Sequence, residues 1–181
     1  PLISHPVYAA YVHGVDGLGD CGIPTSKKSV QSEHAVHALV RLANESPGEF
    51  TLAAIGPLTN LAVALSIDPD LPRKFKQLVI MGGAIYGKGN TDTITAEFNI
   101  HADPEAAHMV FSAWPMLTLL SWETTVAHVF TRATLERFFN LGTPRAKFFH
   151  DTNQIIMNFV KERLGEDILF APDGLALAAA V

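Results

Sequence analysis

The sequence is poor in several features that would each point to a particular class of protein. It contains a single cysteine, Cys21, among its 181 residues. One cysteine cannot form an internal disulfide, and this usage is typical of a reducing compartment, so we expect a cytoplasmic protein. Charged residues make up only 17% of the chain, no run of lysine or arginine occurs, and the formal net charge is -5. We therefore expect no nucleic-acid partner.

Long apolar runs and the usual nucleotide-binding motifs are also missing. No apolar stretch reaches the length of a membrane span, so we expect no contact with a membrane. The segment "VHGVDGLGD" at residues 12–20 is rich in glycine, but it has neither Walker spacing nor the pattern G-x-G-x-x-G. Two interpretations of it stay open, a ligand-contacting loop that begins at His13 or a flexible surface loop that carries a surface histidine.

Apolar residues, in contrast, are plentiful at 48% of the chain, which is enough for a sizeable core. Helical spacing after a Ser32 cap predicts a helix over residues 32–46. A β-rich run at 50–55 leads through Gly56-Pro57 into a helix, with its inward residues expected at Leu58, Leu61, Ala62 and Leu65.

A continuous apolar run, "QLVIMGGAI", begins at residue 77 and has the length of a strand. Such a run between helices indicates a parallel strand that is covered on both faces. Asp103-Pro104 has the pattern of a helix start, with Asp as the N-cap and Pro as the first helical residue. "MLTLLSW" predicts a third strand, and residues 131–140 and 143–164 are expected to be helical. We therefore predict an α/β fold, doubly wound, with a mostly parallel sheet flanked by helices.

The segment "AEFN" at residues 96–99 is the first candidate for a site. In doubly wound sheets, ligands bind beyond the carboxyl ends of the strands, and the loop 84–99 leaves from one of these ends. Acid, aromatic and amide alternate as in an extended chain, which predicts that Glu97 and Asn99 point to the same side. A carboxylate and an amide together can hold the vicinal hydroxyls of a ribose. The alternative is that Glu97 is a structural acid whose partners are backbone N–H groups.

Four further positions are candidates, each with a plainer alternative. The Ile55 carbonyl at a strand end and the Asp173 carboxylate are oxygen ligands that suit a hard cation. The same residues also fit an ordinary strand-turn-helix and a helix cap. Met81 at a strand tip suits either an apolar ligand contact or core packing. Asn90 follows glycines in a loop that we expect to be mobile and to bring its amide near the site.

Taken in order, these segments resemble the inosine-uridine-preferring nucleoside hydrolase family. The resemblance rests on "VHGVDGLGD", "AAIGPLTNLAVAL", "LVIMGGAIYGKGN", "AEFNIHADPEAAHMVF" and "APDGLALAAAV". It implies an α/β domain of roughly 300 residues. It also implies hydrolysis of the N-glycosidic bond of ribonucleosides, with one Ca²⁺ and an oxocarbenium-like transition state. The implied substrate is a small-molecule ribonucleoside, and a homodimer or homotetramer is expected.

The resemblance also implies roles for individual residues. Asp173 and the main-chain carbonyl of Ile55 look like calcium ligands. Asn90, Glu97 and Asn99 look like contacts of the ribose hydroxyls, with Met81 beneath the sugar. His13 is similar to the histidine near the nucleobase, which makes it the one candidate for a catalytic contact in this chain.

The sequence departs from the family pattern in three ways. The first departure is that the motif DxDxGxDD, which in the family pattern supplies the base and most calcium ligands, does not occur. Apart from the family pattern, the apolar run at the end of the sequence has no helix cap. We therefore expect residues 1–181 to be part of a single domain that is truncated at both ends and inactive alone. Pro172 stands where many members have a histidine that protonates the leaving base, and the loop between Met81 and Glu97 is one residue longer than the commonest pattern. The alternative function is a non-catalytic relative that binds a ribosyl ligand.

Overall fold

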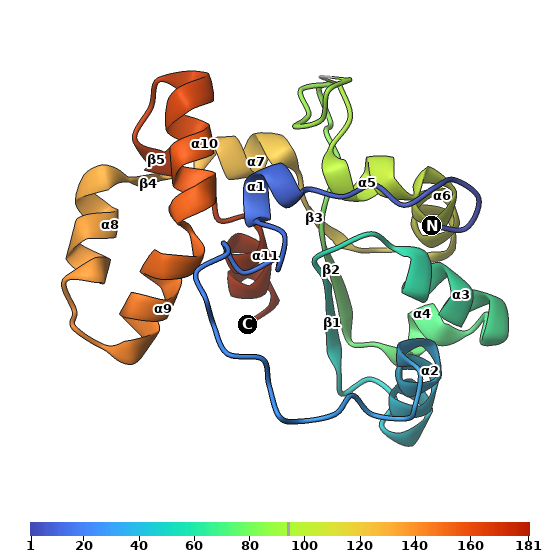
Figure 1. Ribbon diagram of the computed structural model, residues 1–181. Coiled ribbons are helices and arrows are strands. Elements are labelled where there is room, and N and C mark those ends of the chain that lie inside the picture. The colour runs from blue at the N-terminus through green and yellow to red at the C-terminus, as the bar shows by residue number, and fades with distance from the viewer. Residues whose placement is uncertain (94) are drawn as a thin grey trace. The chain divides into compact units, whose positions relative to one another are not determined.

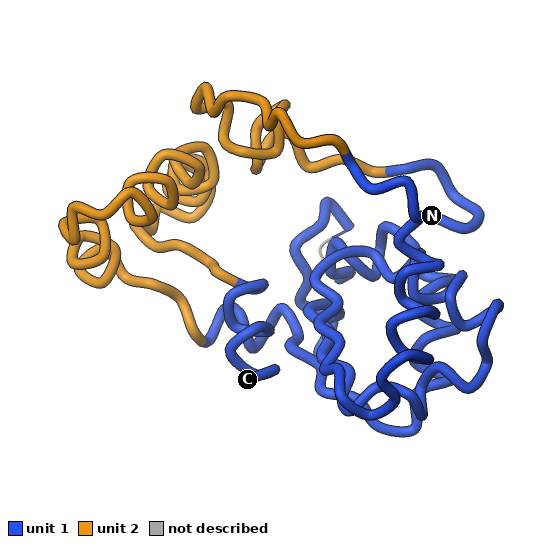
Figure 2. Tube along the Cα trace, turned by 90° about the horizontal axis from the view of Figure 1, so that it is seen from below, with its two compact units in different colours: residues 1–6, 30–127, 172–181 blue, residues 7–29, 128–171 orange. Residues whose placement is uncertain are grey.

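A computed structural model describes residues 1–93 and 95–181, and these residues form two compact units (Figure 2). Unit 1 comprises residues 1–6, 30–127 and 172–181, and unit 2 comprises residues 7–29 and 128–171. The expectation of a single domain stays a prediction. None of the helices in the described residues combines the length and the apolar character needed to cross a membrane.

Unit 1 is built on a parallel sheet. Its strands are β1 (Thr51–Ala54), β2 (Gln77–Met81) and β3 (Thr118–Leu120), in the order β1-β2-β3 (Figure 1). The register pairs Ala54 with Ile80, and Met81 with Leu120, so the carboxyl ends of the three strands lie at the same edge. All three strands fall where the apolar runs predicted them.

Helices connect and cover these strands. They are α2 (Ala35–Glu45), α3 (Thr59–Ile67), α4 (Leu71–Lys74), α5 (Phe98–Ala102), α6 (Pro104–Ala113), α7 (Trp122–Ala127) and α11 (Pro172–Ala180). The predicted start of α6 is confirmed, since the Asp103 side chain accepts a hydrogen bond from the Ala106 N–H and Pro104 is the first helical residue. The predicted inward residues of α3 are buried as well.

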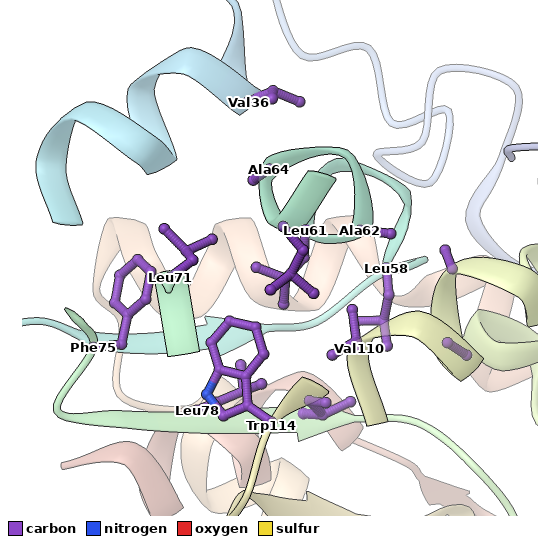
Figure 3. Packing of buried hydrophobic residues seen from close by; sticks show 14 of the residues in the cluster. Val36, Leu58, Leu61, Ala62, Ala64, Leu71, Phe75, Leu78, Val110 and Trp114 are labelled. Carbon is purple, nitrogen blue, oxygen red and sulfur yellow. The ribbon is translucent and has the colours of Figure 1, made fainter. Parts of the chain in front are cut away.

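The central strand β2 is covered on both faces. Leu78 and Ile80 belong to a core cluster with residues of α3 and α6, and Figure 3 shows the side chains of Leu61, Leu78 and Trp114 within this cluster. Val79 and Met81, which alternate with them along the strand, pack against Ala176 of α11. Because successive side chains find apolar partners on opposite faces, the prediction of a doubly wound α/β sheet is confirmed.

Unit 2 is mostly helical. It contains α1 (Ala10–His13), α8 (Arg132–Phe139), α9 (Pro144–Thr152) and α10 (Gln154–Leu164), with an antiparallel pair made of β4 (Phe130–Thr131) and β5 (Ile168–Leu169). Leu135, Met157 and Leu169 form its buried cluster. The expected helical stretch 143–164 is divided at Asn153, whose side chain donates to the Phe149 carbonyl at 2.7 Å.

The cap of α2 differs from its prediction. The helix begins at Ala35, and His34 rather than Ser32 caps it, because His34 Nδ1 accepts a hydrogen bond from the Val36 N–H at 3.2 Å. Ser is the commoner N-cap, but a histidine nitrogen can accept the same bond when the backbone of the histidine is extended, as it is at His34.

Candidate functional site

Two glycines follow β2 and allow the chain to approach a carboxylate closely. A Cβ atom at Gly82 would lie 3.3 Å from Glu97 Oε2, which is tighter than most real contacts. Gly83 has φ of +80°, and its N–H donates to Glu97 Oε2 at 2.9 Å. The end of the sheet is thereby joined to the start of α5 through one buried acid.

Glu97 is the N-cap of α5, which corrects the expectation of an extended segment. Its side chain accepts from the Asn99 N–H at 3.0 Å and from the Ile100 N–H at 3.1 Å, and the residue is 2% exposed. The helix begins at Phe98 because the carboxylate satisfies N–H groups that a first helical turn leaves unpaired. Glu97 and Asn99 therefore do not share the side of an extended chain. Glu97 takes the structural role that the sequence left open, yet its Oε1 accepts from Asn99 alone among the described residues.

The Asn99 side chain is oriented by Met81. Its Nδ2 donates to the Met81 carbonyl at 3.1 Å and lies 3.2 Å from the Met81 sulfur. The carbonyl oxygen can only accept, so the amide nitrogen must face it, and Asn99 Oδ1 points elsewhere. Met81 is 3% exposed and belongs to the core cluster on the α11 face, so core packing is one of its functions.

Asn90 is fastened to the same helix start. Its Oδ1 accepts from the Phe98 N–H at 2.7 Å, and its own N–H donates to the Ala96 carbonyl at 3.1 Å. The preceding residue must be glycine, because a Cβ atom at Gly89 would collide with the Ala96 backbone. The loop thus brings Asn90 beside Glu97 and Asn99 as the sequence suggested, and it does so through hydrogen bonds rather than as a free segment.

The three polar side chains leave a complementary set of unused hydrogen-bonding atoms. Within the described residues, Asn90 Nδ2, Asn99 Oδ1 and one lone pair of Glu97 Oε1 are not committed to protein partners. The set contains one donor and two acceptors beside the carboxyl end of β2. A pair of neighbouring hydroxyl groups, each of which both donates and accepts, matches such a set.

Ile55 and Asp173 also belong to unit 1. Ile55 lies one residue beyond the last pair of the β1–β2 ladder, is 40% exposed and lines a pocket of about 180 Å³. Asp173 is the second residue of α11 and is exposed, and α11 packs on β1 and β2. Pro172 begins the helix, so Asp173 lies in its first turn and is not its cap.

The donor types of these two residues suit a hard cation, but their number is small. A carbonyl and a carboxylate are oxygen ligands of the kind that Ca²⁺ prefers, and Ca²⁺ takes six to eight of them. No group of three His, Cys, Asp or Glu residues that could hold a metal occurs in the part of the chain that the structure describes. The residues therefore fit calcium in kind and would supply a minority of its ligands.

His13 is the last residue of α1 in unit 2, and the glycine-rich loop that follows it is organised. Its carbonyl accepts from the Gly19 N–H at 2.8 Å. The carboxylates of Asp16 and Asp20 accept backbone N–H groups within the loop, and Gly19 lies too close to the Thr152 backbone to carry a side chain. Because His13 belongs to the other unit, its place at a shared site stays a prediction.

Two acids, Asp103 and Glu123, connect segments that are distant in the sequence, which the sequence itself did not indicate. Asp103 is fully buried and accepts from Thr59 Oγ1 at 2.5 Å and from the Leu2 N–H at 2.9 Å, which ties the start of α6 to the start of α3. Glu123 accepts from the N–H groups of Ile85 and Tyr86 at 3.2 and 2.8 Å. Only the capping role of Asp103 had a local signal in the sequence. The other partners of Asp103, and both partners of Glu123, are far from these acids along the chain.

The pKa of Glu123 predicts a dependence of stability on acid. Burial acts to raise this pKa, but hydrogen bonds from Tyr86, its own N–H, Ser121 and Ile85 outweigh it and lower the pKa from 4.5 to about 2. A lowered pKa in the folded state stabilises the fold above the unfolded value of 4.5. That contribution is lost as pH falls from 4.5 towards 2. In thermal unfolding of the full-length protein, Glu123→Gln should therefore have a lower melting temperature than the unaltered protein at pH 7. This deficit in melting temperature should become smaller as the pH is lowered to 2.5. A deficit that stays constant over this range would contradict the assignment.

Comparison with known proteins agrees with this architecture. The family model described as inosine-uridine preferring nucleoside hydrolase matches residues 1–181. The chain is 37% identical over 179 residues to a probable uridine nucleosidase 2 of Oryza sativa subsp. japonica, covering 97% of this chain and 52% of that protein. It is 37% identical over 159 residues to the pyrimidine-specific ribonucleoside hydrolase RihB of Escherichia coli O17:K52:H18 (strain UMN026 / ExPEC), covering 88% of this chain and 49% of that protein.

Among solved structures, the plant nucleoside hydrolase PpNRh1 matches with a TM-score of 0.89 and 33% identity, covering 96% of this chain and 54% of that chain. The sheet and its helices therefore have the fold of a nucleoside hydrolase. The chain belongs to the inosine-uridine preferring nucleoside hydrolase family, as the resemblance indicated. It spans about half the length of the curated relatives that it matches.

Proposed function

We propose that the full-length protein is a ribonucleoside hydrolase, which cleaves the N-glycosidic bond with water to give ribose and a free base. The observation that carries the proposal is the set of unused atoms on Asn90, Glu97 and Asn99 beside the carboxyl end of β2. This is the edge at which ligands of doubly wound sheets bind. Membership of the family supports the same reaction class.

In this proposal the three side chains hold the ribose. Asn99 Oδ1 and Glu97 Oε1 accept hydrogen bonds from sugar hydroxyls, and Asn90 Nδ2 donates one. The Met81 side chain lies beneath the sugar. Cleavage develops positive charge on the ribose ring, and the buried negative charge of Glu97 would stabilise that charge in a site of low dielectric constant.

Calcium is the proposed cofactor, with Asp173 and the Ile55 carbonyl among its ligands. When bound, such an ion can lower the pKa of a coordinated water and orient it towards the substrate. This chain contributes oxygen donors from two elements, the end of β1 and the first turn of α11. His13 is proposed as a contact of the nucleobase. A cytoplasmic homodimer or homotetramer completes the proposal.

Comparing ribonucleosides with deoxyribonucleosides tests the function. Because two relatives are named for uridine or pyrimidine nucleosides, uridine is the first substrate to use, with inosine as the purine counterpart. The full-length protein should release free base from uridine or inosine, and 2′-deoxyuridine should react about tenfold to a hundredfold more slowly, because a hydrogen bond to a charged group is lost. Absence of base release, with nucleoside still bound, would favour the non-catalytic relative.

Pro172→His should change the preference for the leaving base. A proton donor at this position would assist departure of the base, and general acid catalysis is typically worth 10²–10⁴-fold. Turnover should rise most for the base that most needs a proton, so the ratio of inosine to uridine turnover should change. Pro172 is the first residue of α11, where its ring suits a helix start. An unchanged ratio with a small loss of stability would leave Pro172 as a helix-starting residue only.

A further inference from the structure

The turn that follows β2 is held in its middle by an acid from another element. Glu123 Oε1 accepts from the Tyr86 N–H at 2.8 Å, and Glu123 Oε2 accepts from the Ile85 N–H at 3.2 Å. The preceding residue, Trp122, donates its own N–H to the Gly83 carbonyl at 2.9 Å. The first two residues of α7 therefore fasten the turn over residues 83–86.

The segment from Gly83 to Asn90 is also attached at both ends. At its start the Gly83 N–H is bound by Glu97, and at its end Asn90 Oδ1 is bound by the Phe98 N–H. Between these points packing contributes little, because the Ile85 and Tyr86 side chains are 64% and 80% exposed. Besides a long bond of 3.4 Å from the Gly87 N–H to the Ala84 carbonyl, the conformation of the middle thus depends on the Glu123 carboxylate. In the described residues this carboxylate is the acceptor of both the Ile85 and the Tyr86 N–H groups.

We propose that Glu123 is a positioning residue, which holds the turn after β2 so that Asn90 meets the ribose in a fixed orientation. This inference rests on the proposed function, and it adds a residue to which the sequence and the family resemblance gave no role. Glu123 reaches the substrate only through the turn, so it is not itself a contact. The carboxylate matters because each of its two oxygens accepts from one of the two N–H groups, whereas glutamine would place an NH₂ donor against one of them.

Loss of the two hydrogen bonds from Ile85 and Tyr86 to Glu123 should chiefly weaken substrate binding. Without them, the middle of the segment gains conformational freedom that extends to the neighbouring Asn90, and the bound substrate must order the Asn90 amide again. In the full-length protein, Glu123→Gln should raise KM for uridine about tenfold and change kcat by less than about threefold. Glu123→Asp, which keeps a carboxylate, should recover part of the loss. Glu45→Gln is the matched control, since Glu45 is an exposed acid on α2 whose partner is Arg41, and its KM should stay at the unaltered value.

Two further readouts separate positioning from a general loss of stability. Hydrogen exchange followed by mass spectrometry should speed up in peptides covering 84–90, while peptides covering β3 and α6 keep their protection. In a double-mutant cycle, Glu123→Gln and Asn90→Ala should be non-additive in KM, because Glu123 acts on the substrate only through the Asn90 amide, which Asn90→Ala already removes.

The possible outcomes are distinct. Unchanged KM in Glu123→Gln, or additive effects with Asn90→Ala, would overturn the positioning role and leave the proposed function intact. If the unaltered protein neither hydrolysed nor bound uridine and inosine, the proposed function would fail, and the positioning role with it. Faster exchange confined to the turn, a raised KM and non-additivity together would support the role.

Discussion

Replacing Glu97 with alanine in the full-length protein is expected to lower the free energy of unfolding by about 3 kcal/mol or more, and to remove turnover. The carboxylate is 2% exposed and accepts three backbone N–H groups, from Gly83, Asn99 and Ile100. Hydrogen bonds to charged groups contribute about 1.5–3 kcal/mol each, and a buried donor left without a partner is costly. The cap of α5 and its link to β2 are lost together.

Asn99→Ala should behave differently, although the two residues are neighbours. The Asn99 backbone N–H keeps its bond to Glu97, and only the side-chain bonds to Met81 are lost. The free energy of unfolding should therefore fall by about 1 kcal/mol. Turnover of uridine should fall about tenfold to a hundredfold, because Asn99 Oδ1 no longer accepts a sugar hydroxyl.

Urea unfolding and steady-state kinetics on both variants distinguish the two roles. Asn44→Ala is the control, because Asn44 lies on α2 and its side-chain amide donates to the Val40 carbonyl and to Asp68 and accepts from Lys74. This variant should lose at least as much stability as Asn99→Ala and keep its turnover. Ribonucleoside turnover that survives Asn99→Ala unchanged would remove Asn99 from the proposed ribose site. A free energy of unfolding that is unchanged in Glu97→Ala would show that the three N–H groups find other acceptors.

Elements with a local signal could be predicted from the sequence. Asp103-Pro104 specifies the start of α6 through one side chain and one ring, and both act within a single turn. The continuous apolar run of β2 identified a strand covered on both faces, which the separate clusters around Leu78 and Val79 confirm. Placing candidate residues at the carboxyl edge of the sheet needed only the strand order and their direction.

The error at residues 97–99 has a physical cause. Helix α5 is only five residues long, too short for a helical period to show, and alternation of acid, aromatic and amide imitates a strand. What selects the helix is the Glu97 carboxylate, and its position depends on Gly83, fourteen residues earlier. Glu123 shows the same limit, since its partners at Ile85 and Tyr86 lie 38 and 37 residues away. Patterns in a single sequence depend on residues that are close together in the chain. The hydrogen bonds of Glu97 to Gly83 and of Glu123 to Ile85 and Tyr86 join segments that only the folded sheet brings together.

Replacing Asp173 with alanine in the full-length protein should weaken calcium binding by about a hundredfold or more. Loss of residues that merely orient metal ligands already costs about 10–100-fold in affinity, so loss of a charged ligand should reach at least the upper end. Turnover at micromolar calcium should fall in parallel, and millimolar calcium should restore part of it. Without calcium, the loss of this exposed acid from the first turn of α11 should lower stability by at least about 0.3–1 kcal/mol, which is what a negative charge contributes there.

Calorimetric titration with calcium, together with uridine turnover over a range of calcium concentrations, measures both effects of the Asp173→Ala change. Asp70→Ala is the matched control, because Asp70 is an exposed acid beside Arg73 at the start of α4, and its loss should leave calcium affinity unchanged. Asp173→Asn should lie between the unaltered protein and Asp173→Ala, since it keeps an oxygen donor without the charge. Calcium affinity that is the same in all four proteins would exclude Asp173 as a ligand and leave it as a residue that supports the start of α11.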